Sequence, residues 1–296
     1  MKEFIAYRVG PDNSCNNIVL KKWAQMHGLS LQDKYDLSFF FSATYCVPSA
    51  CILYLEQKKQ GILNDAFLDG IKKSLVFQSD RKYMRMKDNL ERCYKDYRKT
   101  HYSVLSFLRK TATGSKIDLE KAVKEVSKWT MYGRFSAFLF LEAFIGISEA
   151  GFVNATIDWK DGETTTSGLL NLFGYDSQAE LFDKTGKLPF SASFLDNLLK
   201  ITVREISKAG ASENVTEIET ALCAYRKFHK GTRYNGYYID RMLEELNVMK
   251  ADFPELCAEL FAIRRNNIDV SLLGEVCGWD GIRTELKKKY LLTGEI

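Results

Sequence analysis

The feature of this sequence that most constrains its fold is the recurrence of apolar residues three or four positions apart, the spacing of one helix face. Residues 34–59 are apolar nearly all round, which predicts helix buried on every side, with Pro48 as a kink or as a break between two helices. Residues 134–150 have the composition of a further buried helix. The best strand signal, at residues 153–159, is short.

We therefore expect an all-α protein with a single helical domain over residues 1–296. The presence of only four prolines among 296 residues fits long helices with few rigid loops. The least regular region is the polar segment 155–168, which is rich in Asp, Gly and Thr. A polar loop of this length in a compact helical protein is more often functional than idle. Two lobes that meet near this segment are the alternative arrangement.

Composition and cysteine usage exclude several classes of protein. The seven cysteines show no Cys-x-x-Cys spacing and only three histidines are present, which argues against a zinc site. The odd, scattered cysteine count predicts reduced thiols inside a cell, and Cys46, Cys51 and Cys223 are read as buried structural thiols. No apolar run has the length of a membrane span. The net charge of +4 does not by itself indicate nucleic-acid binding.

The distribution of charge is more informative, because residues 219–241 combine many cations and tyrosines with two glycines, Gly231 and Gly236. Cations and flat rings beside a flexible backbone suit a polyanion that carries bases or phosphates. A solvated basic loop whose tyrosines cover a neighbouring core is the alternative. Residues 81–99 are also both basic and aromatic, which predicts a locally electropositive face.

A glycine turn precedes the buried helix at residues 134–150. The step Gly133-Arg134-x-Ser-Ala is similar to the turn of helix-hairpin-helix DNA glycosylases, where backbone N–H groups at a helix N-terminus hold a DNA phosphate. The pattern departs from that motif because Tyr132 stands where a second glycine is usual. A buried helix that begins with a glycine is the alternative. Glu142, within the apolar stretch, must find a partner or raise its pKa if it is buried.

The polar segment and the N-terminal region supply the other candidates. Glycosylases of the hairpin class carry an essential Asp at about the distance of Asp158 from the hairpin, and Asp161 and Glu163 are weaker candidates. The run of Thr and Ser at 164–167 is suited to capping a helix N-terminus or to receiving an anion there. Arg8 and Tyr45 lie in the N-terminal region, where a buried tyrosine hydroxyl needs a partner from a ligand or from the backbone.

Four sequence blocks, at residues 38–50, 131–143, 157–174 and 220–241, resemble the phage amino acid:DNA transferases. These transferases are grouped with the α-glutamyl/putrescinyl thymine pyrophosphorylases of DNA hypermodification. The resemblance spans residues 39–241, and its most specific part is Cys-x-Tyr-Arg-Lys, followed by Arg-Tyr-x-Gly and an Asp. It implies a helical, glycosylase-like catalytic domain. It also implies attachment of an amino acid to the methylene of pyrophosphorylated 5-hydroxymethyluracil in double-stranded DNA, with release of pyrophosphate.

The resemblance also suggests roles for particular residues. We expect Lys227 and Arg233 to contact the pyrophosphate, with Arg134 and Arg241 as weaker candidates. Tyr234 and Tyr238 would flank the flipped base or shape its pocket, Tyr45 would contribute to the substrate pocket, and Arg8 would hold the donor's carboxylate. The candidates for the general base, in order, are Asp158, Asp240 and Glu142.

The implied partners are modified DNA and a free amino acid, for which glycine is the favoured donor, and no membrane is expected. We expect no cofactor and no protein-bound metal, although Mg²⁺ can accompany the pyrophosphate. The implied setting is the cytoplasm of a bacterial host. A helix-hairpin-helix DNA glycosylase and a non-enzymatic DNA-binding module are the alternative functions.

Overall fold

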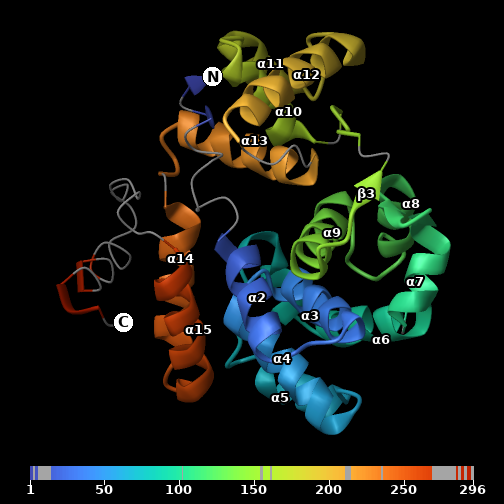
Figure 1. The fold of residues 1–296 in the computed structure, drawn as a ribbon, viewed down its shortest axis with the longest axis vertical. Coiled ribbons are helices and arrows are strands. Elements are labelled where there is room, and N and C mark those ends of the chain that lie inside the picture. The colour runs from blue at the N-terminus through green and yellow to red at the C-terminus, as the bar shows by residue number, and fades with distance from the viewer. Residues whose placement is uncertain are drawn as a thin grey trace. The chain divides into compact units, whose positions relative to one another are not determined.

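The computed structural model describes residues 1–2, 4–5, 15–101, 103–153, 156–160, 162–210, 215–234, 236–268, 285, 288–289 and 292–294. Within these residues the chain forms fourteen α-helices, α2 to α15, together with one 3-10 helix and three very short strands (Figure 1). The expected all-α class is therefore confirmed. The likeness to hairpin-class glycosylases within that class stays a prediction.

The chain divides into two compact units. Unit 1 comprises Met1–Cys15, Thr156–Asp240 and Ile268–Lys288, and unit 2 comprises Asn16–Ala155, Arg241–Asn267 and Lys289–Ile296. One of the divisions falls at the start of the polar segment 155–168, where the sequence allows two lobes. The single catalytic domain over residues 1–296 stays a prediction.

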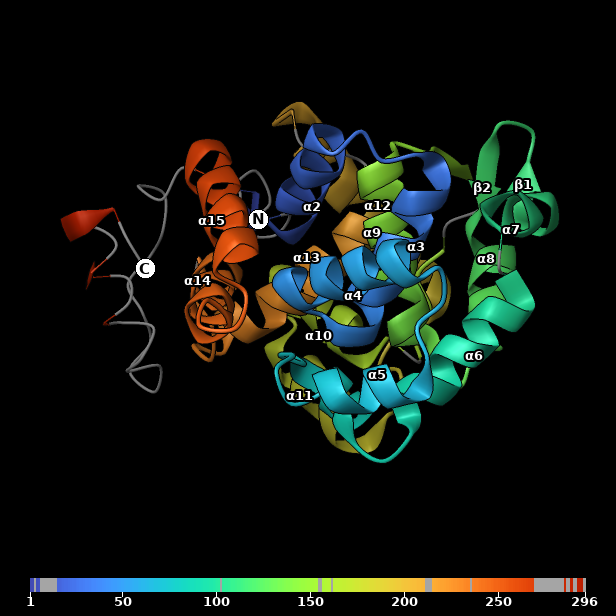
Figure 2. The ribbon, with the colours of Figure 1, turned by 90° about the horizontal axis from the view of Figure 1, so that it is seen from below.

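Unit 2 is built around helix α3. Its helices are α2 (Cys15–Met26), α3 (Leu31–Thr44), α4 (Val47–Gln60), α5 (Asp65–Ile71), η2 (Ser79–Arg85), α6 (Asn89–His101), α7 (Val104–Thr111), α8 (Leu119–Val126), α9 (Arg134–Ser148) and α15 (Pro254–Asn267). α3 is buried from Tyr35 to Thr44 and packs against α4 and α9, which lie beside it in both views (Figures 1 and 2). The ring of Phe39 stacks on that of Tyr97 in α6 with centroids 4.0 Å apart. An apolar surface that runs all round α3 is thus covered by helices on several sides.

The break at Pro48 is confirmed. α3 ends at Thr44, Tyr45 takes the left-handed conformation at φ 53°, and α4 begins at Val47. Pro48 is the second residue of α4, a position at which its missing N–H would have had no helical partner. The proline therefore starts a new helix and does not kink a continuous one.

The three strands of unit 2 form a small sheet in the order β1 (Ala112–Thr113), β2 (Lys116–Asp118) and β3 (Phe152–Val153). Ala112 pairs with Ile117 in the antiparallel ladder, and Ile117 pairs with Phe152 in the parallel one. The strand expected at residues 153–159 is wrong for the most part, because residues 156–160 are not in a strand. The sequence there alternates for only a few residues, and β3 has a single neighbouring strand with which to pair.

Unit 1 consists of α10 (Glu163–Leu172), α11 (Asp176–Thr185), α12 (Ala192–Lys208), α13 (Val215–His229) and the first residues of α14 (Tyr237–Met249), which continues into unit 2. α10 packs on α13 so closely that a Cβ on Gly168 would lie 2.1 Å from the carbonyl oxygen of Leu222. Only glycine fits at this crossing. Gly210 follows α12 with φ 77°, as expected of a residue that ends a helix.

Candidate functional site

The loop between α13 and α14 is held against the end of α13. The backbone N–H groups of Thr232 and Arg233 both donate to the Lys227 carbonyl, at 2.9 and 3.2 Å. Gly231 has φ 66°, a left-handed conformation that allows this reversal of the chain. The turn brings Lys227 and Arg233 close together although they are six positions apart.

Arg233 is fixed by the tyrosines that follow it. Its Nη1 donates to the Tyr238 hydroxyl, and its guanidinium carbon lies 4.7 Å from the ring centre of Tyr237 and 5.1 Å from that of Tyr238. The Tyr234 hydroxyl donates to Asp240 Oδ2 at 2.9 Å, and both of these residues are buried. The arginine, the tyrosines and the carboxylate predicted as site residues in this loop thus form two hydrogen-bonded pairs, Arg233 with Tyr238 and Tyr234 with Asp240.

Three other basic residues, in the last turn of α13 and directly after it, contact carboxylates of α11. Arg226 and Lys230 both pair with Asp183, and His229 lies 3.2 Å from Asp176 Oδ1. The basic stretch of α13 is therefore in part structural. Lys227, by contrast, is exposed and forms no ion pair with any residue that the structure describes.

Cys223 marks the place where Lys227, Arg233 and the start of α10 meet. Burial raises the pKa of the Cys223 thiol, while the nearby positive charges of Arg233 and Lys227 oppose the rise and Thr164 makes a hydrogen bond to it. Cys223 is one turn before Lys227 on α13. Lys227 and Arg233 lie near the N-terminus of α10, which is the positive end of its helix dipole. Together they make an electropositive environment that suits a phosphate group.

Asp158 shapes the turn before α10. Its Oδ1 accepts a hydrogen bond from the Lys160 N–H at 3.1 Å, and its carbonyl accepts one from the Gly162 N–H at 2.8 Å. Such a side chain to backbone bond two residues ahead is an Asx turn. The carboxylate is half-buried. Asp161 lies outside the described residues, and Glu163 is exposed in the first turn of α10.

The threonines and serine that follow do not cap α10, whose N-cap is Gly162. Thr166 donates to the Trp159 carbonyl at 2.6 Å, and Ser167 donates to Asp183 at 2.5 Å. The N-cap expectation for this run is therefore wrong. α10 begins at Glu163, so Thr164 and the hydroxyl residues after it already lie inside the helix. Thr166 and Ser167 therefore bind the segment before α10 and helix α11.

A second cluster lies in unit 2 and contains Tyr45 and Arg241. The guanidinium carbon of Arg241 lies 4.4 Å from the ring centre of Tyr45, and its Nε lies 3.3 Å from Glu245 Oε1. Burial raises the pKa of Glu245 to about 7, against the opposing charge of Arg241 and hydrogen bonds with Cys46 and Gln78. The sequence interpretation missed Glu245, for which the only available signal was its place one helical turn after Arg241.

Two further candidates lie on α9. Gly133 is the N-cap of α9, as the glycine turn predicts, and Arg134 is the first residue of the helix with its guanidinium carbon 4.7 Å from the ring centre of Phe138. Glu142 is half-buried two turns further on. Arg8 lies outside the described residues. The roles predicted for all of these residues stay predictions.

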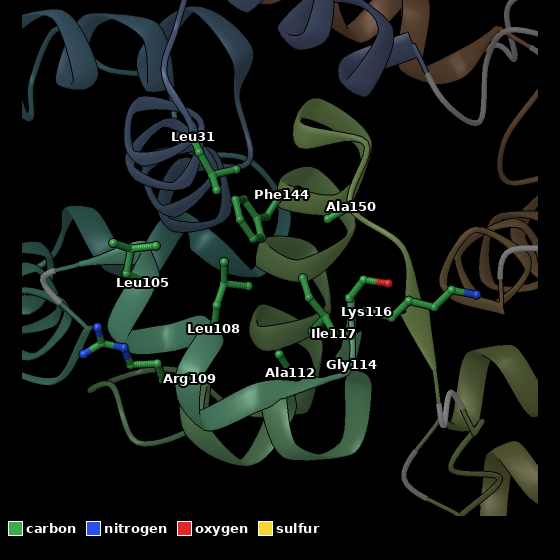
Figure 3. Close-up of a pocket in the computed structure, with 11 residues that line it drawn as sticks. Leu31, Leu105, Leu108, Arg109, Ala112, Gly114, Lys116, Ile117, Phe144 and Ala150 are labelled. Atoms are coloured by element: carbon green, nitrogen blue, oxygen red, sulfur yellow. The ribbon is translucent and has the colours of Figure 1, made fainter.

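A pocket in unit 2 is lined by none of the predicted site residues. Its volume is about 500 Å³, and Figure 3 shows Leu31, Leu108, Ile117 and Phe144 around it. The lining is mostly apolar and has no carboxylate, so it offers no general base. Among the described residues no group of His, Cys, Asp or Glu could hold a metal ion, and no helix is long and apolar enough to cross a membrane.

The fold and these clusters define an all-α protein in which cations and tyrosines lie beside carboxylates, a set suited to a substrate that carries phosphate. Among known families, residues 32–234 match the one described as amino acid:DNA transferase. Because the match covers more than half of the chain, the protein belongs to the amino acid:DNA transferase family. This is the family that the sequence blocks resemble, and it implies DNA and an amino acid as partners. No curated protein matches the chain.

Proposed function

We propose that the protein attaches an amino acid, with glycine as the favoured donor, to the methylene of pyrophosphorylated 5-hydroxymethyluracil in double-stranded phage DNA. The observation that carries the proposal is the family match over residues 32–234. The family accounts for transfer to DNA, and the electropositive environment of Lys227 and Arg233 supports a pyrophosphate leaving group. The proposed setting is the cytoplasm of a bacterial host.

The reaction is a displacement at carbon. The donor's amine nitrogen forms a bond to the methylene carbon while the bond from that carbon to the pyrophosphate oxygen breaks, and pyrophosphate leaves with the electron pair. Lys227 and Arg233 stabilise the charge that develops on the leaving group, with Arg134 and Arg241 as weaker contributors. Mg²⁺ can accompany the pyrophosphate without a dedicated protein site.

The substrate is held by aromatic and cationic side chains in this proposal. Tyr234 and Tyr238 shape the pocket for the flipped base, because their positions are set by hydrogen bonds to Asp240 and Arg233. Tyr45 contributes to substrate binding through its ring beside Arg241. Arg8 holds the donor's carboxylate.

The donor's ammonium must lose a proton before its nitrogen can attack, and a carboxylate accepts that proton. Asp158 is the first candidate because it lies in the polar segment that follows the hairpin-like turn and helix, where glycosylases of the hairpin class carry their catalytic Asp. Asp240 is the second candidate and is buried beside the Tyr234 hydroxyl. Glu142 is the third.

Single-turnover rates against pH for Asp158→Asn and Asp240→Asn distinguish these candidates. With a saturating donor, the variant that lacks the base should lose most of its rate near neutral pH and regain part of it at high pH, where the amine deprotonates unaided. Rates that equal wild type in both variants would assign the proton transfer to another group.

The function itself is tested by product analysis. The protein is mixed with pyrophosphorylated DNA and an amino acid pool, and the digested nucleosides are separated by mass spectrometry. We expect a thymidine that carries an amino acid. Free base in its place would identify a DNA glycosylase, and retention of DNA without any product would identify a binding module.

A further inference from the structure

Arg81 in η2 is a buried cation with no counter-ion among the residues that the structure describes. Its side chain is 0 % exposed, and it forms no ion pair among the described residues. Nη1 donates to the Tyr83 hydroxyl at 2.6 Å, to the Met131 carbonyl at 3.3 Å and to the Ser136 hydroxyl. Nε and Nη2 have no hydrogen-bond acceptor. Arginine stays charged in proteins, and a buried charge is unfavourable unless an anion and hydrogen bonds compensate it.

Aromatic rings compensate this charge only in part. The guanidinium carbon lies 4.9 Å from the ring centre of Tyr132 and 5.2 Å from that of Tyr83. Such contacts stabilise a cation but accept no hydrogen bond along the N–H directions. Asp96 in α6, which like Arg81 lies close enough to Cys93 to act on its pKa, accepts hydrogen bonds from the backbone and the hydroxyl of Thr130. The unpaired N–H groups of Arg81 therefore still call for an anionic acceptor.

The same guanidinium meets the first turn of α9. Ser136 is the third residue of this helix, and the N-cap residue Gly133 has no side chain with which to cap it. The first backbone N–H groups of a helix lack helical partners and lie at the positive end of its dipole. A buried arginine and a helix N-terminus without a side-chain cap thus lie together, and no described carboxylate pairs with the arginine. This combination is characteristic of a phosphate site.

The surface around this place is cationic as well. Lys82, Arg85 and Lys87 are exposed in or directly after η2, and none forms an ion pair with a described residue. Met131 and Phe135 are 40 % and 45 % exposed on either side of Gly133. Exposed cations with apolar side chains among them suit the backbone and the bases of DNA better than a small free anion.

We propose that η2 and the first turn of α9 bind a phosphate group of the DNA backbone, with Arg81 as its buried contact and Ser136 as a second donor. The proposal rests on the proposed function only in taking DNA as the partner. Tyr83 is half-buried, and its hydroxyl bridges Arg81 and the Met131 carbonyl. Outward rotation of Tyr83 would admit the phosphate, whose oxygens would then accept from Arg81.

The test compares Arg81→Met with Arg109→Met, a control in which an exposed arginine of α7 is replaced in the same way. Fluorescence anisotropy with an unmodified duplex is measured over a range of salt concentrations. We expect Arg81→Met to bind at least tenfold more weakly and to lower the slope of log K against log salt by roughly 0.9, the contribution of one phosphate contact. Its melting temperature without DNA should be unchanged or higher, because an unpaired buried charge has been replaced by an apolar side chain.

A structural role for Arg81 predicts the opposite result. In that case Arg81→Met would melt at a lower temperature, while its duplex affinity and salt slope would equal those of Arg109→Met, and the proposal would be overturned. If Arg81→Met does not fold, the double variant Lys82→Met, Lys87→Met replaces it, since both lysines are exposed. The double variant should lower the slope of log K against log salt by roughly 1.8, the contribution of two phosphate contacts. An unchanged slope would overturn the proposal.

Inorganic pyrophosphate identifies the source of the phosphate. If Arg81→Met keeps duplex affinity but loses the rise in melting temperature that pyrophosphate gives wild type, the site binds the leaving group, and the assignment to the DNA backbone is overturned. Binding to an unmodified duplex needs no chemistry. Loss of amino acid transfer with an intact salt slope would therefore count against the proposed reaction and not against this site.

Discussion

At the scale of single residues, cations that are neighbours in the sequence have different environments. Arg226 is buried and paired with Asp183, whereas Arg233, seven positions later, lies against Tyr237 and Tyr238. A charge already neutralised by a carboxylate contributes little to binding another anion. Arg226 is therefore a poor candidate for contacting the leaving group.

Arg233→Ala should lower the single-turnover transfer rate by roughly 10²- to 10³-fold, the range for loss of one charged donor to a developing negative charge. The melting temperature should stay close to that of wild type, because the side chain of Arg233 is only half-buried. Lys230→Ala is the control, since its exposed pair with Asp183 is worth about 0–1 kcal/mol and is not assigned to the substrate. Parallel loss of rate and stability in Arg233→Ala would show that the residue is structural.

Glu245 should make stability depend on pH. Its pKa is raised from 4.5 to about 7 by burial, so the folded state favours the protonated form. The stability that it contributes is fully present below pH 4.5 and is lost as pH rises to about 7. Since each pKa unit is worth roughly 1.4 kcal/mol, the loss is about 3 kcal/mol.

Urea denaturation of wild type and Glu245→Gln between pH 4.5 and 7.5 measures this contribution. The variant carries no titrating group at this position, so its free energy of unfolding should fall less over the interval. The other titrating groups are common to both proteins. Equal slopes would mean that the carboxylate of Glu245 is already ionised at acidic pH.

At the scale of elements, α10 and α13 position the basic cluster of unit 1, and Gly168 sets their distance. A Cβ at this position would overlap the Leu222 carbonyl, which is backbone and cannot turn aside. Thr165 also reaches from α10 to the Glu219 carbonyl, at 3.4 Å. The position of the first turn of α10 relative to Cys223 on α13 depends on this close contact between the two helices.

Gly168→Ala should lower the free energy of unfolding by about 1–3 kcal/mol, as expected for overpacking. Gly70→Ala is the matched control: Gly70 lies within α5, and a Cβ there meets nothing within 4 Å. That variant should gain about 0.5–1 kcal/mol, because alanine loses less entropy on forming a helix. Denaturant titration of both variants gives the comparison. Equal stabilities would mean that α10 and α13 separate without cost.

At the scale of the whole molecule, the expected chemistry requires no metal bound by the protein. Dialysis against a chelator should leave the melting temperature unchanged, because no described group of ligands could hold an ion. Restoration of transfer by Mg²⁺ alone would indicate an ion carried by the pyrophosphate. A melting temperature that falls on chelation would contradict the prediction.

Several features were predictable from the sequence because they depend on residues close together in the chain. Pro48 lies in the first turn of α4, Gly133 precedes α9 and Gly210 follows α12, and each effect is set by the local backbone. The apolar pattern of α3 predicts burial without naming the partners. The family match at residues 32–234 likewise follows from the order of side chains alone.

Other features depend on the tertiary structure, because they join residues distant in the chain. The pairing of Arg226 with Asp183 and the burial of Arg81 beside Ser136 have no local signature. The pKa of Glu245 depends on how completely unit 2 excludes water from that carboxylate. Local sequence thus determined which segments are helices. Packing decided which charges are neutralised and which stay available, because solvent exclusion and ion pairing depend on distances that only the folded chain sets.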